Sequence, residues 1–271
     1  MKIRLNYIGH SGFLCETEEQ YLLFDYFEGR IPPMTGTKPI FVFVSHAHYD
    51  HFNEAIFQLS EQYGRSRVQY VLSSDIGEIE DILERLGDRI IFMKPHETRV
   101  IACGGDAASS KVGRANTCGS VPLTIETLRS NDAGVAWLLS MGGKRIYHAG
   151  DLQLWDWPGE PEADNLHYKE TFETEIDVLN GYLGENGTKN GIDLAMLVLD
   201  ERQEQSAFLG IDYFLSHIRT HYAVPMHSFG HYALYPAYQE HFTELQESGR
   251  IPASSVYLPI SHADQTFELS I

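Results

Sequence analysis

The sequence predicts an α/β fold in which two mixed β-sheets pack face to face with helices on the outside. A β-rich opening is followed by strand–helix units, and this succession occurs twice along the chain. Such an order suits two layers of sheet covered by two layers of helix. The 271 residues, 43% of them hydrophobic, can bury one large core but are too few for a second full domain. We therefore expect a single domain over residues 1–271.

Short apolar segments open the chain and predict a meander of strands. They are rich in β-branched and aromatic residues and are expected at 2–8, 12–16 and 20–25. After a loop rich in Gly and Pro, residues 40–44 form a continuous apolar run that predicts a buried strand. Asn53 is the expected N-cap of the next helix, whose apolar residues recur at helical spacing as far as Gly64.

The middle of the chain alternates strand and helix and then becomes β-rich. A strand is expected at 68–72 and a helix at 78–86, where apolar residues share one helical face. The clearest strands that follow are at 99–102, 121–128 and 135–139. Residues 104–120 are rich in small side chains, and we expect a flexible loop there.

The second half of the chain repeats strand–helix units. A helical segment at about 165–183 carries an apolar stripe, and we interpret residues 159–184 as an insertion over the site. Later strands are expected at 194–199, 223–226, 256–260 and 266–269, with helices at 205–219 and 234–246.

The expected strand 40–44 leads into the heptapeptide Ser45-His46-Ala47-His48-Tyr49-Asp50-His51, which holds three imidazoles and one carboxylate. His46 and His48 are two apart on extended chain and point to one side, while Asp50 and His51 turn toward another. One loop can therefore serve two metal positions. Imidazole and carboxylate suit zinc, iron, manganese or nickel, and the lack of a nearby thiolate pair argues against a closed structural zinc site. We expect an open, catalytic metal site.

This pattern resembles the metallo-β-lactamase superfamily, whose first metal motif reads His-x-His-x-Asp-His. Residues 7–14 and 22–25 look like the opening hairpin of the branch that includes ascorbate-phosphate lactonase-like hydrolases. Residues 146–151 resemble the family's Gly-Asp motif, and residues 224–227 resemble its last histidine motif. The resemblance implies a four-layer αββα sandwich with metals at the sheet edges, where strand ends meet.

The same resemblance assigns two further metal ligands. Asp151 would bridge the two metal ions, which brings two repelling cations close enough to generate hydroxide at neutral pH. His227 would complete the second metal position beside Asp50 and His51.

One departure from the family pattern concerns the first metal position, that of His46 and His48. Many members place a further histidine before the strand that corresponds to 134–138, and this histidine falls at Ser130. Asp132 could substitute as an oxygen ligand, which would tilt the preference toward manganese or iron. Three arrangements stay open: one metal at the second position only, two metals with Asp132 or water in the gap, or a degraded, non-catalytic site.

Further residues are expected around the metals. His10 and His148 are interpreted as outer support for the ligands, or equally as satisfied buried histidines. By resemblance, Asp25 braces the metal loop from beneath. Asp200 ends another strand on the same edge and is a candidate for substrate contact or for ordering its loop. Two interpretations of His231 are equally supported: it lies at the rim of the site and contacts substrate, or it has no role there.

Composition limits the partners and the compartment. The formal net charge of −18 repels polyanions, so no nucleic acid is expected and a small-molecule substrate fits better. The three cysteines, Cys15, Cys103 and Cys118, are widely spaced, which predicts no disulfide framework and a reducing compartment. No window reaches about 18 apolar residues and the start lacks an apolar leader, so we expect a cytoplasmic protein away from membranes. The sequence does not predict the oligomeric state.

These observations predict a metal-dependent hydrolase in which a metal-bound hydroxide attacks an ester, lactone, amide or phosphodiester of a small molecule. Asp50 would orient the water or accept its proton. The cofactor expected is one or two divalent metal ions, zinc first, with manganese or iron as alternatives. A metal-binding protein of the same fold without catalysis is the competing hypothesis. A redox enzyme would need a further cofactor-binding module, for which the chain has no room.

Overall fold

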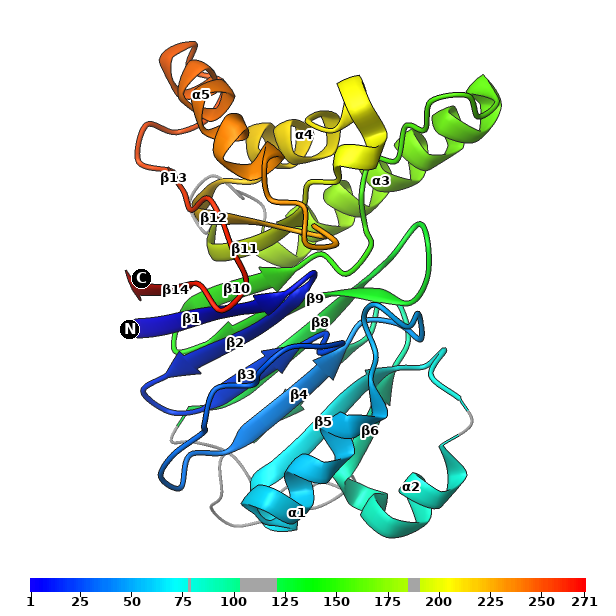
Figure 1. Cartoon of the computed structure of the whole chain (residues 1–271), viewed down its shortest axis with the longest axis vertical. Helices are drawn as coiled ribbons and strands as arrows, with labels where there is room; N and C mark the ends of the chain where they lie inside the picture. The colour runs from blue at the N-terminus through cyan, green and yellow to red at the C-terminus, as the bar shows by residue number, and fades with distance from the viewer. Residues whose placement is uncertain (78, 103–120, 185–190) are drawn as a thin grey trace.

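The computed structural model describes residues 1–77, 79–102, 121–184 and 191–271. Two seven-stranded sheets face each other; α3, α4 and α5 lie on one side of this pair and α1 and α2 on the other (Figure 1). The two termini lie side by side, because the first and last strands pair antiparallel. The predicted αββα sandwich is confirmed. Residues 104–120, where a flexible loop was expected, lie outside the described residues, as do Cys103 and Cys118.

The first sheet has the strand order β14-β1-β2-β3-β4-β5-β6. Its strands are β1 (Lys2–Gly9), β2 (Gly12–Thr17), β3 (Tyr21–Phe24), β4 (Ile40–Val44), β5 (Val68–Ser73), β6 (Ile90–Met93) and β14 (Thr266–Ser270). β14, β1, β2 and β3 pair antiparallel, while β3 to β6 run parallel, so the sheet is mixed. Every residue of β4 is buried, as its unbroken apolar run predicts.

The second sheet has the order β13-β12-β11-β10-β9-β8-β7. Its strands are β7 (Thr98–Ile101), β8 (Leu123–Arg129), β9 (Val135–Met141), β10 (Lys144–His148), β11 (Ile192–Val198), β12 (Thr220–Met226) and β13 (Val256–Tyr257). β10 to β13 run parallel and the remainder antiparallel. The strand expected at 256–260 has only two residues, whereas the one expected at 223–226 begins three residues earlier.

The helices connect the strands across the outer faces. They are η1 (Glu54–Gln58), α1 (Leu59–Tyr63), η2 (Arg65–Arg67), α2 (Glu80–Leu86), η3 (Gly87–Arg89), α3 (Glu162–Leu183), η4 (Glu201–Ser206), α4 (Leu209–His217) and α5 (Leu234–Glu247). Asn53 caps η1 as predicted, since its side chain accepts a hydrogen bond from the Ala55 N–H. The single helix expected at 205–219 is wrong. Its first residues belong to η4, in which Glu204 has φ 50° and ψ −120°, and α4 begins only at Leu209.

The core between the sheets is aromatic near the site. Phe43 of β4 packs edge-on against Trp137 of β9, with ring centroids 5.5 Å apart, and stacks on Phe24 of β3 at 5.1 Å. A separate apolar cluster joins the outer face of the first sheet to α1 and α2. None of the helices in the described part of the chain combines the length and the apolar character that a membrane span requires. Because the strands pack tightly in these two clusters, they form a rigid base for the loops at their ends.

Candidate metal centre

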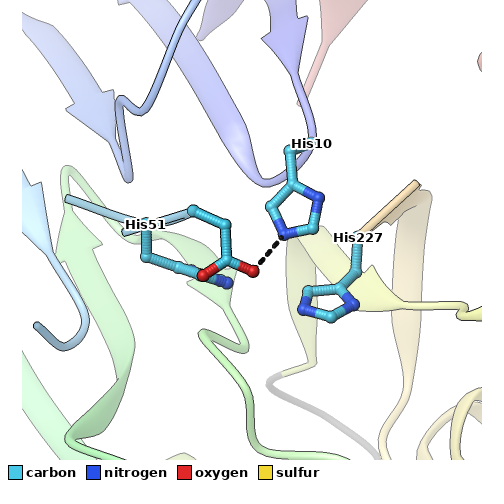
Figure 2. Close-up of side chains that lie close together, drawn as sticks. His10, His51 and His227 are labelled. Atoms are coloured by element: carbon cyan, nitrogen blue, oxygen red, sulfur yellow. Dashed lines mark ion pairs between the residues drawn. The ribbon is translucent and has the colours of Figure 1, made fainter. Parts of the chain in front are cut away.

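Segments from both sheets bring the predicted site residues to one edge of the sandwich. His10 follows β1, residues 45–51 follow β4, Asp151 follows β10 and His227 follows β12. The His227 N–H donates to the His10 carbonyl over 3.0 Å, which ties the two sheets together at this edge. Figure 2 shows His10, His51 and His227 gathered there, and its dashed line marks an ion pair of His10.

The metal loop lies directly on two glycines of the second sheet. A Cβ on Gly134 would lie 2.0 Å from the Ser45 carbonyl oxygen and 2.6 Å from the His46 Cβ. A Cβ on Gly150 would lie 2.9 Å from the Ser45 Cβ. Both glycines have positive φ, +65° and +52°. Only glycine is compatible with such close contacts in this conformation. The turns at the two glycines therefore determine how closely the metal loop packs on the second sheet.

The ligand-type side chains form two groups, in each of which the candidate atoms lie within 4.8 Å of one another. The first, here called the buried group, consists of His10, Asp50, His51 and His227. The second, called the open group, consists of His46, His48, Asp132 and Asp151. All six residues predicted as metal ligands fall into these groups, together with Asp132 and His10.

The Asp151 carboxylate belongs to the open group but also faces the buried group. Its Oδ1 is 3.0 Å from His51 Nε2 and 3.4 Å from His227 Nε2. Its Oδ2 is 3.4 Å from His46 Nε2. One oxygen therefore faces the buried group and the other faces the open group, which is the placement that a carboxylate bridging two ions requires.

Several of these atoms are buried without a hydrogen-bond partner. They are the Nε2 atoms of His46, His51 and His227 and the Oδ1 atom of Asp151. Burying polar atoms unpaired is costly, and their convergence on one point calls for a shared partner. A divalent metal ion satisfies imidazole nitrogens and carboxylate oxygens together. The residues present therefore fit a metal centre.

Hydrogen bonds from behind orient the histidines of the metal loop. His51 Nδ1 lies 2.7 Å from Asp25 Oδ2, and Ser45 Oγ donates to the same oxygen over 2.6 Å. Because Ser45 Oγ donates its proton to Asp25, it accepts a hydrogen bond from His46 Nδ1 over 2.9 Å. Both rings thus carry their proton on Nδ1 and keep the Nε2 lone pair for a metal. The predicted brace from Asp25 has this physical form.

His227 is oriented in the same way by Asp200. His227 Nδ1 lies 2.9 Å from Asp200 Oδ2, and Arg202 donates to both oxygens of that carboxylate. Although burial favours the neutral acid, the hydrogen bonds from His227 and Arg202 lower the pKa of Asp200 to about 2. Asp200 is buried and lies behind His227, which it orients.

His10 differs from the other histidines of the buried group. Its Nδ1 accepts a hydrogen bond from the Phe229 N–H over 3.2 Å, which leaves the ring proton on Nε2. Nε2 faces Asp50 Oδ2 at 3.3 Å. Burial lowers the pKa of His10 to about 4, so the ring is neutral at pH 7. This arrangement matches a ring that holds the Asp50 carboxylate rather than one that offers a lone pair to a metal.

The open group is more exposed. The side chains of His48 and Asp132 are 51% and 46% exposed, and His48 Nδ1 lies 3.6 Å from Asp132 Oδ2. Ser130, at the position of the family's missing histidine, is buried, and its Oγ accepts from the Asp132 N–H. Ser130 therefore shapes the turn, whereas Asp132 brings its carboxylate to the metal side.

Two other predicted residues lie outside the ligand groups. His148 Nε2 donates to the Ser11 carbonyl and its Nδ1 accepts from the Gly150 N–H. It thus fixes the turn before Asp151 rather than the carboxylate itself. His231 is 66% exposed and pairs with Glu201 at 2.6 Å, which places it on the rim.

A cleft of about 380 Å³ opens onto the metal ligands. Its floor includes His48, Asp50, Asp132, Asp151 and His227, and its walls are formed by Tyr49, Trp155, Trp157, Tyr168, Arg202 and Phe229. Segments 152–170 and 228–236 both contribute to these walls. Sequence reasoning missed Arg202 and gave Ser45 no role. In the sequence, only their positions point to them: Arg202 comes two residues after Asp200, and Ser45 comes directly before the histidine motif.

Comparison with known proteins places this geometry in a family. The family described as "Beta-lactamase superfamily domain" matches residues 4–156, more than half of the chain. The chain belongs to this superfamily. The prediction drawn from the histidine and Gly-Asp motifs is thereby confirmed at the level of the superfamily, while the lactonase-like branch stays a prediction.

Relatives among curated proteins carry a common name. A "UPF0173 metal-dependent hydrolase" of Desulforamulus reducens is 28% identical over 158 residues, 56% of this chain and 63% of the relative. Another of that name, from Carboxydothermus hydrogenoformans, is 25% identical over 261 residues, 92% of each chain. The match thus spans less than two thirds of the first relative and most of the second.

Solved structures of similar fold span several chemistries. Igni18 of Ignicoccus hospitalis, described as a novel metallo hydrolase, has a TM-score of 0.56 and 19% identity over 100% of both chains. CmlA of Streptomyces venezuelae, a diiron β-hydroxylase, has a TM-score of 0.59 and 13% identity over 98% of this chain and 54% of its own. At these identities the likeness shows the fold alone.

Proposed function

We propose that the protein is a metal-dependent hydrolase that uses water to cleave an ester, lactone, amide or phosphodiester of a small molecule. The observation that carries the proposal is the Asp151 carboxylate, which faces both the buried group and the open group of ligand-type side chains at a cleft. The names of the curated relatives support the same class of reaction.

The two groups define two metal positions. His46, His48, Asp132 and Asp151 would hold one ion, and Asp50, His51, Asp151 and His227 the other. A bound divalent ion lowers the pKa of water and stabilises negative charge on the oxygen of the bond being cleaved. Zinc suits this set of imidazoles and carboxylates, and manganese or iron would gain from the oxygen ligands.

Asp50 is the residue best placed to manage the proton of the attacking water. It lines the cleft, and His10 fixes one of its oxygens. Burial favours its neutral form, but the hydrogen bond from His10 holds the pKa of Asp50 well below its usual range. At neutral pH it is an anion that can orient the water and accept a proton from it.

Replacement of the bridging residue tests the proposal. Asp151→Ala should lower metal content and abolish hydrolysis together, because it removes a ligand from both positions. Metal is measured by elemental analysis, and hydrolysis with a panel of esters, lactones, amides and phosphodiesters. Asp88→Asn, at an exposed ion pair with Arg65, is the control and should keep both properties. Full metal content and activity in Asp151→Ala would refute the assignment.

The competing function is a metal-binding protein without catalysis. The exposure of His48 and Asp132 and their 3.6 Å separation favour this alternative, because a loosely held ion activates water poorly. Protein reconstituted with zinc, manganese and iron in turn separates the two. Stoichiometric metal with no turnover on any substrate would establish the binding function.

A further inference from the structure

Arg202 is the single Lys or Arg side chain among the residues that line the described cleft. The chain has a net charge of −18, so a cationic side chain on the wall of the cleft is unexpected. Its side chain is 50% exposed, although a buried carboxylate, Asp200, lies beside it. The guanidinium is therefore held at the boundary between the protein and the cleft.

The contacts of Arg202 fix the plane of its guanidinium. Nε and Nη2 donate to the Asp200 carboxylate, with Nε 2.9 and 3.0 Å from its two oxygens. The guanidinium carbon lies 4.5 Å from the Phe229 ring centroid and 5.4 Å from that of Trp157. A paired edge and two neighbouring aromatic rings leave the group little freedom, so it is preorganised before any ligand arrives.

One nitrogen of the guanidinium stays available. Within residues 1–77, 79–102, 121–184 and 191–271, Nη1 has no hydrogen-bond partner. The hydrogen bonds to Asp200 raise the pKa of Arg202, and the nearby charges of Asp151 and Asp50 add to this effect. Arg202 lines the same cleft as Asp50, Asp151 and His227, so one small molecule in the cleft can reach both the guanidinium and the metal ligands.

We propose that Arg202 is a specificity-determining residue that binds an anionic oxygen group of the substrate, a carboxylate or a phosphate, while the bond to be cleaved lies at the metal ligands. This inference rests on the proposed function and names its substrate class, a small molecule with an anionic group at some distance from an ester, lactone or amide. Carboxylates and phosphates are the groups that a guanidinium edge binds best.

A purely structural role for Arg202 makes a different prediction. Through Asp200 the guanidinium also helps to orient His227. If this were its whole purpose, replacement would weaken the metal centre toward every ligand alike. Recognition of an anion instead requires a loss confined to ligands that carry the second charge.

Binding of matched ligand pairs separates the two roles. The probes are succinate, glutarate and adipate, each compared with its monoamide, and affinities are measured calorimetrically on the zinc-loaded protein. Both members of a pair offer one carboxylate to the metals and differ only in the charge of the other end. For the length that spans the cleft, the diacid should bind about tenfold more tightly, the value expected for one charge-assisted hydrogen bond.

The variants give the decisive readout. Arg202→Met should reduce the diacid-to-monoamide ratio to about one, while Arg202→Lys should retain part of it. Asp200→Asn disturbs the same chain to His227 but keeps the guanidinium, so the ratio should persist. Melting temperature and zinc content verify that each variant is folded and loaded. Comparing 3-phosphonopropionate with succinate then shows whether phosphate or carboxylate is preferred.

Three results would overturn the inference. The first is a wild-type ratio near one at all three lengths, and the second is a ratio unchanged in Arg202→Met. The third is equal loss of the ratio in Asp200→Asn and Arg202→Met, which would support the structural role instead. These outcomes are independent of the proposed reaction, since binding needs no turnover. Absence of hydrolysis with a preserved charge preference would refute only the reaction.

Discussion

The two ligand groups of the metal centre differ in how they are held. In the buried group, His51 is fixed by Asp25 and His227 by Asp200, each through a hydrogen bond to Nδ1. In the open group, His48 is half exposed, and its Nδ1 lies 3.6 Å from the carboxylate of the half-exposed Asp132. Ligands held from behind lose little freedom on binding a metal, whereas free ones must be ordered. The buried group should therefore bind its ion first and more tightly.

The largest effect is expected on removing a ligand from each group in turn. His51→Ala should lower affinity for the tight ion by more than the roughly 10- to 100-fold that loss of an outer partner costs. His48→Ala should leave the tight ion in place and weaken only the second. Zinc affinities measured with a chelating competitor check this pair. An equal loss of affinity for the tight ion in both variants would contradict the distinction between the buried group and the open group.

A smaller effect is expected from the outer support. Asp25→Asn keeps the size of the side chain but weakens the hydrogen bond that fixes His51, so zinc affinity should fall roughly 10- to 100-fold. His231→Gln, on the rim, is the control and should change affinity little. Zinc affinity of Asp25→Asn equal to that of the wild type would mean that support from behind does not set the order of binding.

The contact beneath the loop gives a third test. Gly134→Ala should destabilise the fold by about 1–3 kcal/mol and displace His46, because the new Cβ meets the Ser45 carbonyl. Gly143 also has positive φ, +74°, but no atom lies within 4 Å of a Cβ there. Gly143→Ala therefore reports the cost of the backbone conformation alone. Equal melting temperatures for the two variants would show that the close contact carries no energy.

The sequence predicted those parts of the fold that local pattern determines. Both ends of strand 40–44 were predicted correctly, because an unbroken apolar run of this length is typical of a strand that is buried on both faces. The helix expected at 205–219 starts too early, because residues 205 and 206 belong to η4 and α4 begins only at Leu209. Helical periodicity alone therefore overextended that helix.

The site was predictable to the extent that its residues lie in motifs. Asp132 was proposed because it neighbours the position of the absent histidine, and the structure brings it into the open group. The roles of Ser45 and Arg202 depend on contacts with Asp25 and Asp200, which are distant or unmarked in the sequence. Such contacts become visible only once the strand ends meet.

A stepwise zinc titration of the metal-free protein tests the central claim most directly. The account predicts two equivalents, the first bound more tightly than the second, and loss of only the second in Asp132→Ala. A single equivalent in the wild-type protein, two equivalents of equal affinity, or loss of the tight ion in Asp132→Ala would contradict it.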